Sequence, residues 1–313
     1  IMIEGEDLLL CPTCGTHFDI LAESPPSGYC RICDDPRQYI PATGQAWTSL
    51  KAEAGKHETK WKQDEQDKRI WSIWAEPKLT RPQRIARDRP TRPPHPNPHG
   101  NILWDCIAYL DKPLIDFVNN FPRRPLQHHN LPPHFYTTHL SWSAVFSCPV
   151  YTHALDEKWL SISPTADTRR VLLRDKYTEI VKGVTAIQVG GHFEGSMVLH
   201  WDGVGEEGGE EQGGHLFIAD TFVNVPSGFY RKDRPPGTTS FSFMWSIPNM
   251  IPLPPDTILE MWKAIKPYDF TATHGLFPGW DISDENVKKS VLDSMKIQVR
   301  NQGFASHALL DEE

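Results

Sequence analysis

The sequence lacks the features that would hold a protein in a membrane or send it across one. No apolar run comes close to the roughly 20 residues that a membrane-spanning helix needs. Residues 1–7 have neither the basic start nor the long apolar stretch of a secretory signal. These absences predict a cytoplasmic protein that makes no membrane contact.

Positive charge is also in short supply. The 313 residues include 32 Lys and Arg against 40 Asp and Glu, which gives a formal net charge of −8. Such a balance does not favour the broad basic surface that binds nucleic acid. The Arg- and Pro-rich stretch 77–99 has two interpretations, a basic nucleic-acid arm and an irregular loop. The loop is favoured, because repeated Pro forbids a helix.

Cysteine is scarce, and four of the six cysteines form one short pattern. Cys11 and Cys14 are followed, after fifteen intervening residues, by Cys30 and Cys33. Each Cys-x2-Cys turn lets two thiolates reach one ion, and two such turns complete a tetrahedral shell. Zinc is favoured over disulfides or a redox pair, because both turns are present at the spacing of a zinc ribbon and we expect a reducing compartment. Since sulfur fills every position, this zinc is predicted to be structural.

The composition divides the chain into four parts. Residues 1–48 form the zinc-ribbon-like module and a connector, and 49–99 are charged and then Arg- and Pro-rich, which predicts an irregular segment. Residues 100–300 form an α/β domain, and 301–313 are a tail. The expected strands are 101–105, 184–189, 196–201 and 215–220, and the expected helices are 107–119, 256–265 and 284–296. Cys106 and Cys148 stand in apolar surroundings and are predicted to be buried.

Three short motifs place His or Asp beside expected strands. They read Gly190-Gly191-His192-Phe193-Glu194-Gly195-Ser196, Leu216-Phe217-Ile218-Ala219-Asp220 and Thr273-His274-Gly275. Strands fix the geometry of such ligands, and the adjoining loops leave one coordination position open. The combination is therefore typical of a catalytic zinc or di-metal site.

In this order and spacing, the motifs resemble those of the metallo-β-lactamase superfamily, and most closely a fungal-type branch with an N-terminal cysteine module. The resemblance covers residues 100–300 and implies an α/β (α+β) fold, a four-layer αβ/βα sandwich with metals at one edge of the sheets. It implies that His192 is the third histidine ligand of one metal and that Asp220 is the bridging carboxylate. His274 would be a ligand of the second metal position. Asp105 matches an early strand-terminal Asp that supports the metal loop without binding the metal.

One stretch departs from the superfamily pattern His-x-His-x-Asp-His. It reads Pro132-Pro133-His134-Phe135-Tyr136-Thr137-Thr138-His139. His134 fits the second histidine, whereas Pro132 stands in place of the first. Tyr136 stands in place of the Asp and Thr137 in place of the last histidine. His139 comes two positions late and is taken as a substitute ligand.

The segments that lead into Asp105 and into the altered histidine stretch are unusual. Residues 81–99 and 122–133 are both rich in Pro and Arg. Because Pro cannot donate to a strand ladder, we expect no central strand in either segment. The sandwich would then lack strands.

Two functional hypotheses follow. The first is a hydrolase that holds one or two zinc ions besides the structural one and uses a zinc-bound hydroxide on an ester, lactone, amide or thioester. His134, His139, His192, Asp220 and His274 would hold the metal, and Asp220, or another residue that the sequence does not identify, would orient the water. The substrate would be a small molecule. The second hypothesis is a degenerate, non-catalytic protein of the same fold that acts as a binding or interaction module.

Overall fold

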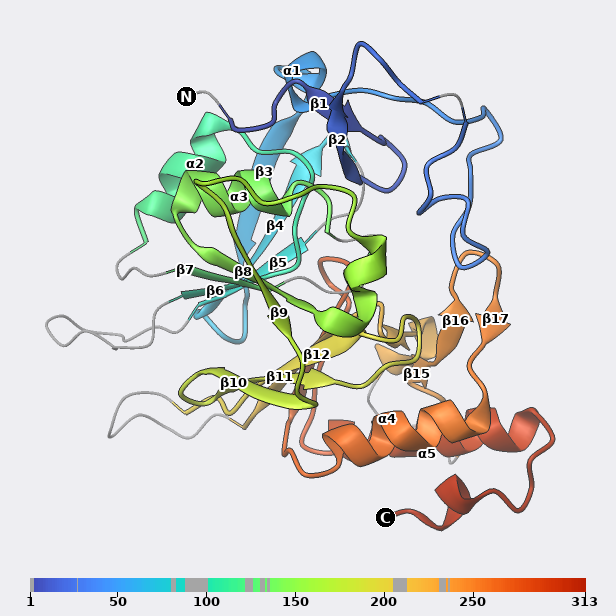
Figure 1. Ribbon diagram of the computed structural model, residues 1–313. Coiled ribbons are helices and arrows are strands. Elements are labelled where there is room, and N and C mark those ends of the chain that lie inside the picture. The colour runs from blue at the N-terminus through green and yellow to red at the C-terminus, as the bar shows by residue number, and fades with distance from the viewer. Residues whose placement is uncertain are drawn as a thin grey trace, which may run out of the picture. The chain divides into compact units, whose positions relative to one another are not determined.

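The computed structural model describes residues 3–26, 28–79, 83–87, 101–121, 126–129, 133, 136–204, 213–230, 235 and 237–313. The chain forms two compact units, Ile1–Leu173 and Arg174–Glu313 (Figure 1). Their boundary falls inside the predicted 100–300 domain. In the described ranges, no helix combines the length and the apolar character needed to span a bilayer.

The first unit is built on a seven-stranded sheet in the order β3-β4-β5-β6-β7-β8-β9. The strands are β3 (Glu58–Gln63), β4 (Ile70–Glu76), β5 (Gln83–Arg87), β6 (Asn101–Trp104), β7 (Leu126–His129), β8 (Pro149–His153) and β9 (Arg169–Leu173). Neighbours from β3 to β6 are antiparallel, and neighbours from β6 to β9 are parallel. Parallel strands need crossover connections, which here include the helices α2 (Lys112–Asn119) and α3 (His139–Phe146).

The start of α2 and the packing of both helices follow from their sequences. The carboxylate of Asp111 accepts a hydrogen bond from the backbone N–H of Leu114 at 2.9 Å and so caps the start of α2. Leu114 of α2 and Trp142 of α3 are completely buried in one apolar cluster with Leu103 of the sheet. This cluster is the core of the first unit.

The expectation that residues 81–99 and 122–133 contain no central strand is wrong. β5 lies between β4 and β6, and β7 lies between β6 and β8. The physical reason is the placement of proline, because both strands lie between prolines and neither contains one. Every residue within these two strands can therefore donate its N–H to the ladder. The segment 49–99, predicted to be irregular, likewise contains β3 and β4.

The cysteine module precedes this sheet and belongs to the same unit. It contains β1 (Leu8–Leu10) and β2 (His17–Leu21), which pair antiparallel, and it is followed by the short helix α1 (Leu50–Glu53). A short 3₁₀ helix, η2 (Ala154–Trp159), follows β8. The backbone N–H of Asp19 in β2 donates to the carbonyl of Ser161 at 3.2 Å, so the module is tied to the residues after η2.

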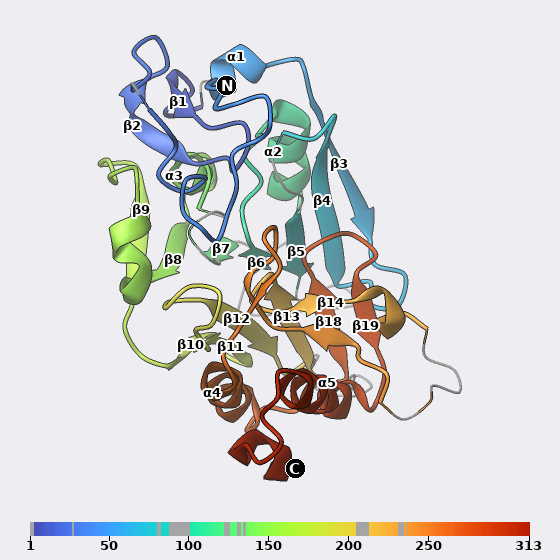
Figure 2. The ribbon, with the colours of Figure 1, turned by 90° about the vertical axis from the view of Figure 1, so that its right-hand side faces the viewer.

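The second unit has a six-stranded sheet in the order β10-β11-β12-β13-β18-β19. The strands are β10 (Tyr177–Val181), β11 (Val184–Gln188), β12 (Met197–Trp201), β13 (His215–Ala219), β18 (Ala272–Gly275) and β19 (Asp281–Ser283). The helices α4 (Pro255–Ile265) and α5 (Val287–Asn301) lie side by side against this sheet (Figure 2). Small two-stranded sheets join β14 (Val223–Asn224) to β15 (Phe241–Ser242) and β16 (Met244–Ser246) to β17 (Ile251–Pro252). Two short 3₁₀ helices, η3 (Pro226–Gly228) and η4 (Ala308–Asp311), also belong to this unit.

The elements predicted for this part of the chain are confirmed. β11, β12 and β13 fall within the three expected strands, and α4 and α5 match the two expected helices to within a few residues. All residues of β12 and β13 are buried, which explains their continuous apolar runs. The mixed α/β class is confirmed as well, and each unit supplies one large sheet with its own helices.

Candidate metal sites

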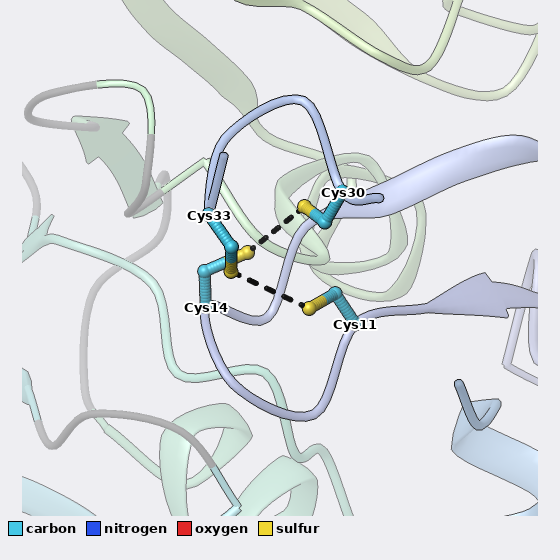
Figure 3. Close-up of side chains that lie close together, drawn as sticks. All are labelled: Cys11, Cys14, Cys30 and Cys33. Carbon is cyan, nitrogen blue, oxygen red and sulfur yellow. Dashed lines mark hydrogen bonds between the residues drawn. The ribbon is translucent and has the colours of Figure 1, made fainter. Parts of the chain in front are cut away.

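The four cysteines of the N-terminal module converge. The sulfur of Cys11 lies 3.7 Å from that of Cys33, and the sulfur of Cys14 lies 3.5 Å from that of Cys30 (Figure 3). All four ligand atoms lie within 4.8 Å of one another, and all four residues are buried. The spacing matches a closed tetrahedral sulfur site of the kind that holds structural zinc.

The local backbone explains why the sulfurs meet. Gly15 has a φ of +78°, and its N–H donates to the carbonyl of Cys11 at 2.7 Å, which closes the first knuckle. The side-chain amide of Gln45 donates to the sulfur of Cys11 at 3.3 Å. Burial raises the pKa of the Cys14 thiol well above its usual value. Hydrogen bonds from the other three cysteines lower the pKa of the Cys11 thiol. A divalent cation would remove this conflict by taking all four as thiolates.

Cys106 and Cys148 lie outside this cluster and are buried, as predicted. Burial raises the pKa of each thiol to about 12, so both remain protonated at neutral pH. They serve as small packing groups.

His192 is placed by a glycine turn between β11 and β12. Gly190 and Gly191 have φ values of +70° and +88°, which favour glycine. A Cβ atom on Gly191 would lie 2.9 Å from the sulfur of Met261 in α4. The turn therefore packs tightly on the helix and delivers the imidazole into the interior, where its side chain has no solvent exposure.

The imidazole of His192 faces the carboxylate of Asp220. Nδ1 lies 2.7 Å from the carbonyl oxygen of Trp245, which can only accept, so Nδ1 carries the proton. In the neutral imidazole Nε2 therefore carries the lone pair, and it lies 3.6 Å from Oδ2 of Asp220. Asp220 directly follows β13 after Ala219, whose φ of +42° turns the chain, and its side chain is also fully buried.

His274 lies on β18 in a chain of three polar side chains. Its Nδ1 lies 3.0 Å from Oδ1 of Asp281 in β19, and its Nε2 lies 2.9 Å from Nδ1 of His215 in β13. A carboxylate behind Nδ1 is the arrangement that orients many zinc-binding imidazoles. In this conformation, however, Nε2 points at His215. No sequence pattern pointed to His215, because its contact with His274 depends on the parallel register of β13 and β18.

The remaining predicted residues lie in the first unit. The Nδ1 of His139 donates to the carbonyl of Tyr136 at 2.7 Å, and its Nε2 lies 3.3 Å from a guanidinium nitrogen of Arg170. Both ring nitrogens are thus engaged, and His139 offers neither to a metal in this conformation. Asp105 directly follows β6, buried and with a φ of +70°, as a strand-terminal Asp would. His134 lies outside the described residues.

Within the described ranges, the four cysteines are the only group of three or more His, Cys, Asp and Glu side chains whose ligand atoms converge closely enough to hold a metal. His192 and Asp220 form a converging pair, and His274 does not join them in such a group. The ligand set proposed for the second site therefore depends on this pair.

Comparison with known proteins gives one close relative and several structural neighbours. No protein-family model matches the sequence. Over 297 residues the chain is 32% identical to "Uncharacterized protein YmaE" of Bacillus subtilis (strain 168), covering 92% of this chain and 95% of that protein. The structure is similar to that of VMB-1, with 12% identity, a TM-score of 0.49, and 78% of this chain and 98% of that chain covered. It is also similar to the metallo-β-lactamase from Pontibacter korlensis, with 11% identity, a TM-score of 0.43, and 76% and 99% covered.

Proposed function

For this chain, which belongs to the same family as YmaE of Bacillus subtilis, we propose a metal-dependent hydrolase function with a second, closed zinc site in its cysteine module. The observation that carries the proposal is the His192–Asp220 pair. An imidazole lone pair and a carboxylate oxygen face each other at 3.6 Å inside the protein, with no solvent exposure. Two buried acceptors in this arrangement are stabilised by a cation that both can bind.

The donor set fits a divalent metal. A zinc ion lies about 2.0–2.2 Å from its nitrogen and oxygen ligands, so two ligands of one ion can lie up to about 4 Å apart. The separation of 3.6 Å between His192 and Asp220 falls within that span. The hydrogen bond from His192 to the carbonyl of Trp245 fixes the ring and its tautomer, as second partners of metal-binding histidines do. His134, which lies outside the described residues, stays a predicted metal ligand from its place in the motif alone.

A bound divalent metal would supply a nucleophilic water at neutral pH and would polarise the carbonyl of an ester, lactone, amide or thioester. The protein's own groups have three tasks. His192 and Asp220 hold their ligand atoms in place from a tight turn and from a strand end. Asp220 can also accept a proton from the attacking water. The complete burial of both side chains excludes competing bulk water and strengthens their electrostatic interactions.

His274 belongs to the proposal as a ligand of a second metal position. The contact with Asp281 at 3.0 Å already orients its ring. To bind, its Nε2 must be released by His215, which lies 2.9 Å away. His139 is left out of the proposed site, because both of its nitrogens are engaged by other groups of the first unit.

A non-catalytic metalloprotein is the second candidate. It is favoured by the orientation of His274 toward His215 and by Pro132, which stands where the superfamily has its first histidine. Such a protein would keep the cysteine zinc and the fold without hydrolysing a substrate.

Hydrolysis assays on matched variants separate the two candidates. The purified protein should hydrolyse a panel of generic esters, thioesters and lactones, lose this activity with a chelator, and regain it with added zinc. Asp220→Asn and His192→Gln should each reduce the rate by at least about a hundredfold. His200→Gln is the control, because His200 is a buried histidine on β12 whose Nε2 contacts the carbonyl of Asp269 at 2.8 Å. No activity on the panel would support the non-catalytic candidate, whereas activity that survives Asp220→Asn would exclude Asp220 from the reaction.

A further inference from the structure

A pocket of about 440 Å³ lies in the first unit, between the cysteine module and the residues that follow η2. One wall comes from the module, and the other comes from residues 157–163 and from β9. Its lining includes Phe18, Asp19, Arg31, Glu157, Ile162 and Arg170. The volume is in the range of small-molecule sites. None of these residues takes part in the proposed hydrolase site.

Arg170 is the least exposed charged side chain in this pocket. Its Nη1 donates to the carbonyl of Ile162 at 2.8 Å and lies 3.3 Å from Nε2 of His139. Burial lowers the pKa of its guanidinium, although not enough to remove the charge from an arginine. Among the residues that the structure describes, no carboxylate forms an ion pair with Arg170. A half-buried cation without a counter-ion is costly, and such groups are normally compensated by a bound anion.

The guanidinium is held in a fixed orientation. His139 donates from Nδ1 to the carbonyl of Tyr136 at 2.7 Å, so its Nε2 is an acceptor that faces Arg170. The two contacts of Arg170 use a single nitrogen, Nη1. Its Nε and Nη2 donors form the fork that binds a carboxylate in bidentate fashion.

Two carboxylates also line the pocket. Asp19 accepts a hydrogen bond from the backbone N–H of Ser163 at 2.7 Å through Oδ2, which leaves Oδ1 to meet a ligand. Glu157 is exposed on the same lining. The negative charge of both carboxylates raises the pKa of Arg170, but neither carboxylate forms an ion pair with it. The pocket therefore presents two guanidinium cations, from Arg31 and Arg170, and two carboxylates that form no ion pair with Arg170.

The remaining lining combines apolar side chains with the polar side chains of Arg31, Ser161 and Ser163. Phe18 and Leu160 are half-buried, and Ile162 is buried. Arg31, between two of the clustered cysteines, donates to the carbonyl of Lys158 and lies 5.8 Å over the ring of Trp159. The zinc knuckle thus closes one side of the pocket.

We propose that this pocket binds a small apolar α-amino acid. Arg170 would take the carboxylate, Asp19 and Glu157 would take the ammonium group, and Phe18 and Ile162 would contact the side chain. A dianion is disfavoured by the two carboxylates, and a simple amine is disfavoured by the guanidinium. A small zwitterion places a carboxylate beside the guanidinium and an ammonium group beside the two carboxylates, so both of its charges are paired. Because the zinc module supplies one wall, binding also requires an intact cysteine site.

Isothermal titration calorimetry on the full chain tests the proposal, with L-leucine as the probe. Leucine should bind saturably. 4-Methylpentanoate lacks only the ammonium group and 3-methylbutylamine lacks only the carboxylate, so each should bind at least about tenfold more weakly. Arg170→Met should weaken leucine binding by about thirtyfold, the loss expected for a charged hydrogen-bonding partner. Arg169→Met is the matched control, because Arg169 is exposed and does not line the pocket.

A second variant keeps the test decisive if Arg170→Met fails to fold. Asp19→Asn retains an oxygen that can accept from Ser163 but loses the charge, and it should weaken leucine binding by about tenfold. No saturable binding of leucine to the wild-type protein would overturn the proposal. Equal affinity for leucine and 4-methylpentanoate, or leucine binding that is unchanged in both Arg170→Met and Asp19→Asn, would overturn it as well.

Discussion

Nε2 of His192 lies 3.6 Å from Oδ2 of Asp220, and the proton on that imidazole resides on the opposite nitrogen, where the carbonyl of Trp245 accepts it at 2.7 Å. The two groups reach this position from a glycine turn and from a strand end, and their side chains are fully buried. An imidazole lone pair and a carboxylate that face each other in this way can serve as two ligands of one metal ion.

The glycine turn should be essential for this geometry. In Gly191→Ala, the added Cβ would lie 2.9 Å from the Met261 sulfur, at a φ of +88°. We expect a loss of unfolding free energy of about 2–4 kcal/mol, from left-handed strain and overpacking together. Denaturant titration measures this loss. Gly279→Ala is the matched control: its φ is +83°, and nothing lies within 4 Å of the new Cβ, so only the strain remains. Equal losses in the two variants would contradict the tight packing described for the turn.

The cysteine module should depend on zinc for its stability. Cys30→Ser removes one of four thiolates, so the variant should lose one equivalent of zinc and unfold at a lower temperature, by several degrees or more. Elemental analysis and thermal unfolding measure the two effects. Cys148→Ser serves as the control, because Cys148 is buried outside the cluster and should leave the zinc content unchanged. If Cys30→Ser retained all of its zinc, the cysteine site would be refuted.

Stability should fall in mild acid because of His17. Burial lowers the pKa of this histidine to about 4 in the folded protein, against about 6.5 when unfolded. Between these values the unfolded chain binds more protons, so the free energy of unfolding decreases as the pH falls from about 6.5 to about 4. The full effect is about 3 kcal/mol. In His17→Gln, which cannot titrate, urea unfolding should show a shallower pH dependence than in the wild type. Identical slopes would exclude this role.

His215 should hold His274 away from metal. His215→Phe keeps an aromatic ring between Trp201 and His274 but removes the nitrogen that lies 2.9 Å from Nε2 of His274. We expect zinc to bind the second metal position about tenfold more tightly in this variant. His215→Phe combined with His274→Asn should cancel the gain. Titration with zinc against a competing chelator measures both. An unchanged affinity in His215→Phe would remove His274 from the proposed ligand set.

The sequence predicted best where a local pattern decided the structure. Short, largely apolar segments predicted β11, β12 and β13, and the two Cys-x2-Cys turns predicted the converging sulfurs. The sequence predicted the structure worst where the positions of the prolines within a segment mattered more than their number. β5 and β7 form because the prolines lie outside the strands, which a count of prolines over the whole segment hides.

The site was only partly predictable for a related reason. His192 and Asp220 stand in short motifs, and the structure places them face to face. The partners of His274 and His139 come from other strands, through the register of β13 with β18 and through Arg170 on β9. Side-chain partners that depend on tertiary register leave no local pattern in the sequence.

Zinc content measured by elemental analysis on two matched variants tests the central claim most directly. The wild-type protein should hold at least two equivalents, one in the cysteine cluster and at least one bound by His192 and Asp220. The double variant His192→Gln with Asp220→Asn should retain only the cysteine-bound equivalent, and Cys30→Ser should retain only the other. A wild-type protein with a single equivalent that the double variant keeps in full would contradict the proposed metal site at His192 and Asp220.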